Sequence, residues 1–215
     1  MNLTLYIKKI KRNLNDYGIS QTAKKIILFL LKNIYLKRSY YIYRLDLRLD
    51  FCPELPPAGI LFKIISKNDV QIIKQIENTE EWLYGRFPSC LEHGLCIVAL
   101  DDNKVVGFNL INFNETFMPL INITKRLRAN QAWSEQITIK KDYRKQGLAM
   151  SLRHYVFTEL RKRGICKLYG GTLVANIPSI KLAQRLGFLF ITSVQYLKIF
   201  DREYHTYRRI KNGDL

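Results

Sequence analysis

The sequence predicts a mixed α/β fold, with one main domain and an N-terminal extension. Apolar residues make up 47% of the chain and charged residues 25%, which is the ordinary composition of a folded protein. Segments of alternating apolar residues recur between segments of helical period, so strands and helices are interspersed. Residues 132–174 read as strand, loop, helix and strand, and such a unit places two parallel strands side by side.

A proline-rich segment at residues 51–59 separates the extension from the main domain. It holds three prolines and a glycine, which interrupt regular structure. We therefore expect an extension over residues 1–57 and the main domain over residues 58–215. Within the extension, residues 20–37 carry an apolar stripe that predicts a helix, and residues 39–47 alternate and are rich in tyrosine and isoleucine, which predicts a strand.

Alternation, helical period and turn residues define the elements of the main domain. Strands are expected at residues 60–65, 96–100, 105–111, 132–139, 165–174, 188–200 and 205–210. Helices are expected at residues 69–77, 80–84, 148–162 and 178–186. The turn at residues 101–103 joins two strands in a hairpin, and Gly164 ends the third helix. Residues 112–128 are expected to be irregular, and the last two strands to form a second hairpin.

The net charge of +17 favours anionic partners. Residues 1–57 hold 11 Lys and Arg against 4 Asp and Glu, so the extension is more basic per residue than the rest. A field of this sign attracts a phosphate-bearing cofactor, an acidic protein, an anionic membrane surface or nucleic acid. Charge alone does not choose among them.

Neither a membrane span nor a metal site is expected. The longest apolar run, residues 26–31, is far short of the ~20 residues that span a bilayer, and the N-terminus lacks the pattern of a signal peptide. We therefore expect a cytoplasmic protein with reduced cysteines. Cys90, His93 and Cys96 lie close in sequence but lack the fourth ligand of a structural zinc site, so they are read as a loop that leads into a strand.

Residues 137–149 have the pattern of an anion-binding loop. An expected strand runs into a basic loop and then directly into a helix, whose first amides have no partner within the helix and carry its positive dipole. Gly147 permits a tight turn and close backbone approach, and Arg144 and Lys145 add positive charge. A diphosphate is the natural ligand of such a loop. Taken alone, the pattern also fits an ordinary strand-to-helix turn.

Two motifs in order make the interpretation more specific. The first is Arg144-x-x-Gly147-x-Ala149, and the second is Asn176-x-x-Ser179, which the segment Leu-Gly-Phe at residues 186–188 follows. In these residues the sequence resembles the GNAT superfamily of N-acetyltransferases. The resemblance covers residues 60–210 and leaves out the extension.

The resemblance implies a mixed, mostly antiparallel sheet, flanked by helices, in which two parallel strands splay apart at the cofactor. It implies acetyl-CoA as the cofactor, with its pantetheine arm beside the expected strand at residues 132–139 and its diphosphate on the loop that follows. The cofactor-binding residues that it implies are Ile137, Thr138, Ile139, Arg144, Lys145, Gln146, Gly147, Leu148, Ala149, Asn176 and Ser179.

The resemblance also implies direct transfer of an acetyl group to the primary amine of a small molecule or peptide. Glu135 is the candidate base or substrate anchor, because alternation would place it on the same strand face as Ile137; otherwise it is a half-exposed strand glutamate. Many family members protonate the leaving thiolate with a tyrosine, but Ala183 occupies that position here. Tyr169 and Tyr196 are candidates by residue type.

Other functions remain open at this point. The protein could use a longer acyl-CoA or an acyl-carrier protein, or bind CoA without catalysis. The basic and aromatic run at residues 37–44 would suit nucleic acid, but no nucleic-acid motif accompanies it, which makes this the less favoured alternative. The extension is expected to dock on the main domain beside the acceptor site; its alternative is a contact with an acidic protein or an anionic membrane.

Overall fold

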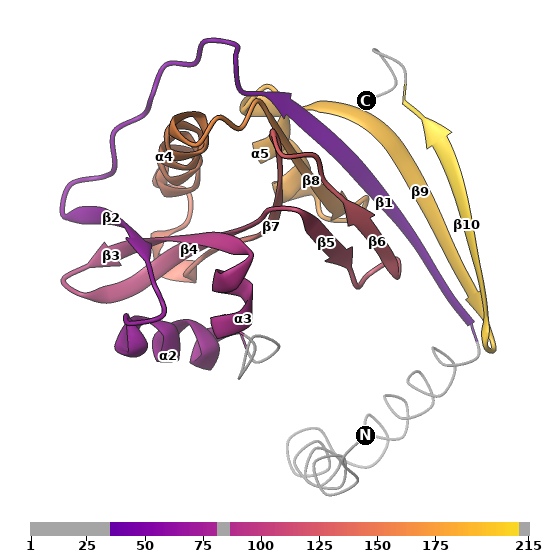
Figure 1. Ribbon diagram of the computed structural model, residues 1–215, viewed down its shortest axis with the longest axis horizontal. Coiled ribbons are helices and arrows are strands. Elements are labelled where there is room, and N and C mark those ends of the chain that lie inside the picture. Colours follow the sequence, from indigo (N-terminus) through magenta and orange to yellow (C-terminus); the bar gives the residue numbers. More distant parts are fainter. Residues whose placement is uncertain (1–34, 81–86, 211–215) are drawn as a thin grey trace, which may run out of the picture.

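A computed structural model describes residues 35–80 and 87–210. Its main feature is an eight-stranded sheet in the order β10-β9-β1-β8-β7-β4-β3-β2. β7 and β8 pair in parallel and every other pair in this sheet is antiparallel. Helices α4 and α5 lie on one side of the sheet and α2 and α3 on the other (Figure 1). The predicted fold class, a mixed and mostly antiparallel sheet flanked by helices, is confirmed.

The observed elements follow the expected order closely. The strands are β1 (Tyr35–Asp46), β2 (Ile60–Ile65), β3 (Gly94–Asp101), β4 (Lys104–Asn112), β5 (Glu115–Met118), β6 (Ile123–Arg126), β7 (Gln131–Ile139), β8 (Lys167–Leu173), β9 (Leu189–Ile199) and β10 (Arg202–Arg209). The helices are α2 (Val70–Thr79), α3 (Phe87–Glu92), α4 (Leu148–Lys162) and α5 (Ile177–Arg185), with a 3₁₀ turn at Lys141–Tyr143. Asp102 and Asn103 have positive φ, as the tight turn of the β3–β4 hairpin requires.

β1 begins earlier than the sequence predicts. The helix expected at residues 20–37 lies outside the described residues except at its end, where Tyr35–Lys37 are strand. These residues pair with Leu197–Ile199 of β9, so that part of the helix prediction is wrong. The pairing partner lies far along the chain, and a local helical period carries no information about it.

Two short elements were missed. Residues 90–92, expected in a loop, belong to α3, whose Phe87 is buried in an apolar cluster with Ile73 and Ile76 of α2. The segment expected to be irregular contains the β5–β6 hairpin, which buries Met118 and Ile121 against Trp133. Of the short helix expected at residues 80–84, only Glu80 is described, and it lies outside α2 as its C-cap.

β1 comes from the expected extension and yet lies inside the sheet. It pairs with β8 on one side and β9 on the other. The loop after it packs on α4: Leu47 is 1% exposed, Phe51 stacks on His154, and the Glu54 amide donates to Nδ1 of His154 at 3.0 Å. Residues 35–57 therefore add a central strand and a packed loop to the main sheet.

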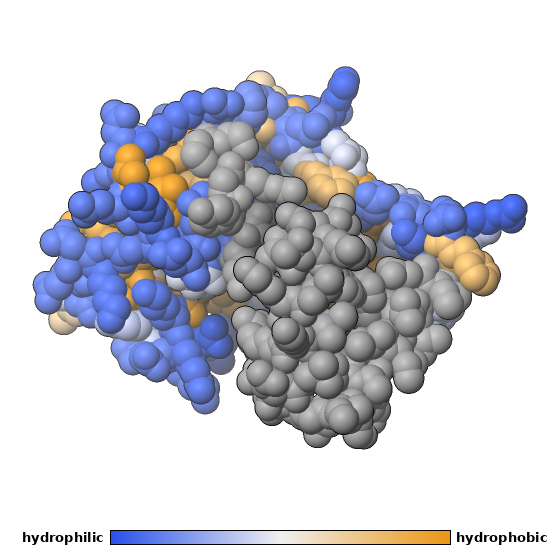
Figure 2. Space-filling view, turned by 90° about the horizontal axis from the view of Figure 1, so that it is seen from below, coloured by the Kyte–Doolittle hydropathy of each residue, from blue (hydrophilic) through white to orange (hydrophobic). Residues whose placement is uncertain are grey.

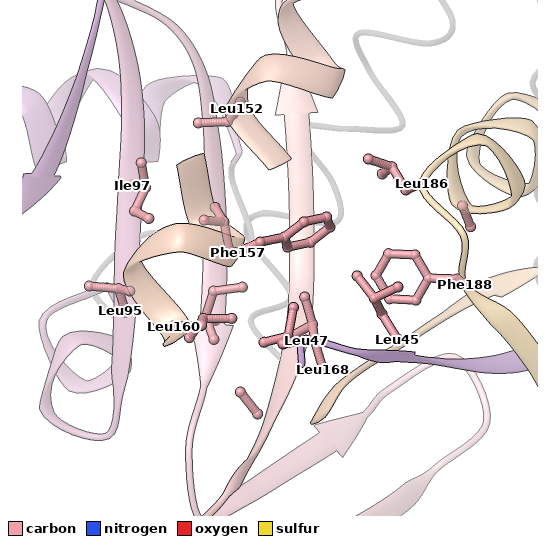
Figure 3. Packing of buried hydrophobic residues seen from close by; sticks show 14 of the residues in the cluster. Leu45, Leu47, Leu95, Ile97, Leu152, Phe157, Leu160, Leu168, Leu186 and Phe188 are labelled. Carbon is pink, nitrogen blue, oxygen red and sulfur yellow. The ribbon is translucent and has the colours of Figure 1, made fainter. Parts of the chain in front are cut away.

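The largest apolar cluster lies between the sheet and α4. The apolar stripe of α4 supplies Leu148, Leu152, Val156 and Leu160, all 2% exposed or less. Figure 3 shows Phe157 of this helix between two groups of side chains, with Leu186 and Phe188 on one side and Leu95 and Ile97 on the other. This packing fixes α4 against β3, β4 and β7 and so holds the loop at its N-terminus in place.

The surface agrees with the basic composition. Hydrophilic residues cover most of the described surface seen in Figure 2, and apolar residues show in small patches. Among the helices of the described chain, none has the length and apolar character needed to cross a membrane.

Candidate functional site

The sheet opens between β7 and β8. These strands pair from Gln131–Lys167 to Ser134–Gly170 and no further. Beyond that point β7 continues along β4 to Ile139, whereas β8 continues along β1. We call the resulting opening the wedge; its closed end is the Ser134–Gly170 pair. The predicted splay of the parallel strands is confirmed.

The loop between β7 and α4 turns tightly at the open end of the wedge. Lys145 and Gly147 have φ of 64° and 80°, so two residues within three adopt the left-handed region. The first bonds inside α4 run from Met150 and Ser151 to the carbonyl of Gly147, which leaves the preceding helix amides free for a ligand. A Cβ at Gly147 would meet nothing within 4 Å, because this side of the loop faces open space.

A cavity of about 530 Å³ lies over this loop, and we call it the cofactor cavity. Arg144, Lys145 and the N-terminus of α4 line the loop side of it, and β7 and α5 line the rest with largely apolar side chains, together with Ser179 and Arg185 of α5. Of the residues implied by the family resemblance, it brings together Ile137, Ile139, Arg144, Lys145, Gly147, Leu148, Ala149 and Ser179. A bound diphosphate with an extended arm fits this division into a cationic end and an apolar wall.

The side chains of three expected cofactor-binding residues make hydrogen bonds within the protein and do not line the cofactor cavity. The Thr138 hydroxyl lies on the other face of the sheet and donates to the Glu80 carboxylate at 3.1 Å. The Gln146 amide group donates back to the carbonyl of Asp142 at 2.9 Å. Asn176 caps α5, where its Oδ1 accepts from the amide of Ser179 at 3.3 Å.

Arg144 supports the loop. Its Nε donates to the carbonyl of Ile139 at 2.9 Å and so ties the loop to the end of β7, while its side chain lines the cofactor cavity. Lys145 lines the same end, so the cavity keeps its positive charge.

The wedge continues from the cofactor cavity to the other face of the sheet. A central cavity of about 340 Å³ shares Ile137, Ser179 and Leu182 with the cofactor cavity. A third cavity of about 330 Å³, which we call the acceptor cavity, is lined largely by apolar residues. It shares four residues with the central cavity: Tyr40, Leu120, Glu135 and Gln136. Two molecules that approach from opposite faces could therefore meet inside the wedge.

Glu135 lies on the opposite face from Ile137, contrary to the alternation argument. Leu110 of β4 pairs with Gln136, and the next residue, Ile111, pairs with Ser134, so Glu135 is the extra residue of a β-bulge. A bulge re-aims the side chains around it. Ile137 packs in the cluster under α4, whereas Glu135 opens into the acceptor cavity.

The Glu135 carboxylate is held in place and has altered acidity. Its Oε2 accepts hydrogen bonds from Asn112 Nδ2 at 3.0 Å and from the Thr116 hydroxyl at 2.9 Å. Burial raises the pKa of this carboxyl, and the bond from Thr116 opposes that shift in part. A carboxylate with a raised pKa is a stronger base, as proton transfer from an ammonium group requires.

Two tyrosines that the sequence argument did not select line the central cavity. Tyr43 lies on the side of α4 and α5, in the same cluster as Ala183, and burial raises its pKa, so it keeps its proton at neutral pH. Tyr40 lies on the other face with Trp133. Their rings cover Gly170 and Gly171, where any Cβ would collide with them. Tyr169 and Tyr196, the candidates by residue type, lie instead in the cluster around Trp133.

The four cysteines form no disulfide, and none lines the cofactor, central or acceptor cavity. Within residues 35–80 and 87–210, no three His, Cys, Asp or Glu side chains come together as metal ligands.

Solved structures of other proteins share this fold. The structure of a Drosophila protein superposes with a TM-score of 0.55 at 14% identity, over 87% of this chain and 59% of that one. A GCN5-related N-acetyltransferase from Sphaerobacter thermophilus superposes with a TM-score of 0.51 at 17% identity, over 87% of this chain and 57% of that one. The chain thus spans less than three fifths of either protein.

Sequence comparison identifies the family. No curated protein matches the chain by sequence. The sequence profile described as the acetyltransferase (GNAT) family matches residues 65–188, which is more than half of the 215 residues. The matched region runs from the end of β2 to the start of β9 and includes the wedge, the loop before α4 and the N-terminus of α5. The chain therefore belongs to the GNAT family of acetyltransferases.

Proposed function

We propose that this protein transfers an acyl group from an acyl-CoA directly to the primary amine of a small molecule or peptide. The observation that carries the proposal is the wedge itself. It joins a cavity with a cationic loop on one face to a cavity with a basic carboxylate on the other. Acetyl-CoA is the donor that the family name indicates.

The cofactor cavity would hold the donor. The free amides at the start of α4 would bind the diphosphate, together with Lys145 and with Arg144, whose Nε is held by the carbonyl of Ile139. The unpaired edge of β7 at Ile137 and Ile139 would run beside the pantetheine arm, because β8 leaves that edge open. A bound acyl-CoA supplies the acyl group as a thioester that an amine can attack.

Two side chains would move protons. Glu135 would accept a proton from the ammonium group of the acceptor, directly or through water, and release the neutral amine that attacks. Tyr43 would donate its proton to the departing sulfur, the role for which the family's usual tyrosine is replaced by Ala183. Both groups line the central cavity, one on each face of the sheet.

The acceptor cavity favours an amine attached to an apolar group. Phe117, Met118, Pro119, Leu120 and Trp133 line it beside Glu135, so an ammonium group would pair with the carboxylate while its carbon skeleton covers the apolar wall. A cytoplasmic location belongs to this proposal. So does an anionic partner, an acidic protein or a membrane surface, for the basic residues 1–57.

The direct test is turnover. Purified protein is incubated with acetyl-CoA or longer acyl-CoAs and a panel of amines, and thiol release and the acylated amine are measured together. We expect equal amounts of both products and no acyl group on the protein by mass spectrometry. An acyl-enzyme on any cysteine contradicts direct transfer, and binding of CoA without turnover of any amine favours a non-catalytic module.

Replacing Glu135 with glutamine is expected to lower kcat by ~10²-fold or more, the usual weight of a general base. Both hydrogen bonds end on Oε2, so an amide oxygen placed there keeps them. As the pH rises through the raised pKa of Glu135, the rate of the wild-type protein should increase. The rate of the variant should not show this increase. CoA affinity should be unchanged, because Glu135 faces away from the cofactor cavity.

The stability of the same variant provides a check. A carboxyl with a raised folded pKa stabilises the fold below its unfolded pKa, and this contribution is lost as pH rises through the folded value. Glutamine should therefore not lower the melting temperature at neutral pH. Glu115→Gln, an exposed residue of β5, is the matched control and should keep full activity. Loss of CoA binding in the Glu135 variant would show that the residue shapes the strand instead.

Replacing Tyr43 with phenylalanine is expected to lower kcat by ~10²-fold, as general acids do, and to do so with every donor. Its hydroxyl makes one long hydrogen bond in the described structure, 3.5 Å to the carbonyl of Gly171, so stability should change little. Tyr41→Phe on the same strand is the control, since Tyr41 lines no wedge cavity. A loss of rate in Tyr40→Phe but not in Tyr43→Phe would assign the proton to the other tyrosine.

A further inference from the structure

Arg153, in the second turn of α4, is a buried cation in the wedge. It is 4% exposed and lines the central cavity. Its Nη1 donates to the hydroxyl of Ser134 at 2.6 Å, whereas its Nε is buried and has no hydrogen-bond partner in the described structure. None of the ion pairs formed among residues 35–80 and 87–210 includes it.

Nothing in the described chain neutralises this charge. A guanidinium stays protonated at physiological pH, and removing it from water without an anion is strongly unfavourable. Glu135 is the carboxylate that shares the central cavity, but it lies on the other face and binds Asn112 and Thr116. Arg153 is thus better explained as half of an ion pair whose other half is a ligand.

The position of Arg153 indicates which part of a ligand it would meet. The cofactor cavity follows β7 from the loop before α4 to Ile137, and the wedge closes at the Ser134–Gly170 pair. An arm extended along β7 would therefore direct its thioester toward Ser134, the residue that Arg153 binds. The part of the acyl chain beyond the thioester carbonyl would then approach the guanidinium of Arg153.

We propose that the preferred acyl donor is the CoA thioester of a short dicarboxylic acid, and that Arg153 binds the free carboxylate at the end of the acyl chain. This proposal rests on the proposed function and names its donor. A guanidinium presents its N–H groups in a planar fork that fits both oxygens of a carboxylate. Ser134 takes one N–H of Arg153, which leaves Nε and the remaining N–H groups for the ligand.

The reaction balances with this donor. The amine nitrogen forms a bond to the thioester carbonyl carbon and the carbon–sulfur bond breaks. Glu135 takes one proton from the ammonium group before the attack and releases it to solvent. The sulfur receives a proton from Tyr43, and the second proton that leaves the nitrogen returns to Tyr43 through water, so one proton is released overall. The distal carboxylate takes no part and stays on Arg153, so the product is an amide that carries a free carboxylate. Acetyl-CoA would fit the same site as a smaller and poorer donor, because it leaves Arg153 unpaired.

Two other roles for Arg153 make different predictions. A carboxylate of the acceptor would have to reach across the wedge, since the acceptor cavity lies on the far face and Arg153 does not line it. Stabilisation of the leaving thiolate or of the carbonyl oxygen would help every acyl donor equally. A donor that carries its own carboxylate is the case in which Arg153 acts on one class of donor.

The test compares donors of equal shape. Binding of CoA, succinyl-CoA and 4-methylpentanoyl-CoA is measured by calorimetry, and kcat/KM is measured with one accepted amine. The last two donors differ in a terminal carboxylate against an isopropyl group; malonyl-CoA and 3-methylbutanoyl-CoA form the shorter pair. In at least one pair we expect the carboxylate donor to be preferred by ~10²-fold, a typical loss when a buried charge pair is broken.

Arg153→Met keeps the volume and removes the charge. We expect the preference to disappear in this variant, while CoA affinity stays the same and the melting temperature stays or rises, because a buried charge is removed. Arg153→Lys should keep part of the preference. Arg163→Met, the same change at the exposed end of α4, should keep all of it.

The outcomes separate this proposal from the proposed function. If CoA binds but neither carboxylate donor is preferred over its neutral partner, the donor assignment is wrong and the acyltransferase proposal stands. If Arg153→Met slows all donors equally, Arg153 acts on the reacting atoms and the assignment is wrong as well. Absence of CoA binding in the wild-type protein overturns both.

Discussion

Replacing Gly147 with aspartate is expected to weaken CoA binding by ~10³-fold. The residue lines the cofactor cavity at the start of α4, where the diphosphate would lie. A unit charge about 4 Å from one of like sign costs ~4 kcal/mol at an effective dielectric constant near 20, which corresponds to roughly a thousandfold in affinity. In the free protein a Cβ at this position meets no atom within 4 Å, so the effect should fall on binding and not on packing.

A substitution at the other end of α4 controls for the backbone strain that an aspartate introduces at Gly147. Gly147 and Gly164 flank α4 with φ of 80° and 75°, are exposed, and have open space where a Cβ would be. Gly164→Asp therefore imposes similar left-handed strain, on the order of 1 kcal/mol, away from the cofactor cavity. Calorimetry should show lost CoA affinity in the Gly147 variant and normal affinity in the Gly164 variant. Normal affinity in a folded Gly147→Asp protein would mean that the diphosphate binds elsewhere.

The accuracy of the sequence predictions depended on how local each feature is. The bounds of α4 were predicted because an apolar stripe and a basic last turn lie within the helix and a glycine lies just beyond each end. The β3–β4 hairpin was predicted because its turn needs residues that tolerate positive φ, and Asp102 and Asn103 supply them. The loop of the cofactor cavity is likewise one contiguous motif.

Features that depend on distant partners were not predicted. The sequence placed a strand near residue 39 but could not place it between β8 and β9, because that order results from pairing with segments far along the chain. The four-residue strands β5 and β6 exist because Met118 and Ile121 find an apolar surface at Trp133, which no local pattern reveals. The bulge that turns Glu135 to the acceptor side is set by its register with β4.

The groups inside the wedge show the same limit. Tyr43 is one of 13 tyrosines, and its place in the central cavity follows from the position of β1 in the sheet. Arg153 had a usable signal: it lies three and seven residues before Val156 and Leu160, on the apolar side of α4, where a charged residue is out of place. A charged residue on an apolar helix face is thus worth testing as a ligand contact when the helix lies beside a candidate site.

A chain that begins at Pro56 is expected not to fold cooperatively. Removing β1 separates the β9–β10 hairpin from the rest of the sheet, because β1 is the strand that joins β9 to β8. It also removes the buried side chains Tyr40, Ile42, Tyr43, Leu45 and Leu47. At about 2 kcal/mol each, these contribute on the order of 10 kcal/mol, which is comparable to the whole stability of a typical domain, about 5–15 kcal/mol.

A chain that begins at Tyr35 is the matched truncation, since it keeps β1 and every described contact. Thermal unfolding followed by circular dichroism should show a cooperative transition for this chain and none for the chain that begins at Pro56. Both should be compared with the full-length protein for CoA binding, and the full-length and Tyr35 chains for sedimentation with anionic vesicles. Vesicle binding by the full-length protein alone would assign the membrane contact to residues 1–34.

The two truncations thus separate residues 1–34 from the strand and loop at residues 35–55, a division that the sequence composition does not indicate. The proline-rich segment marks the end of a packed loop, because Phe51 and the Glu54 amide hold it on His154 of α4. If the chain that begins at Pro56 unfolds cooperatively near the full-length melting temperature and turns over its substrate, β1 is dispensable and the sheet must close between β8 and β9 without it. That result would also remove Tyr43 from the mechanism, so one stability measurement tests both the strand order and the proposed proton donor.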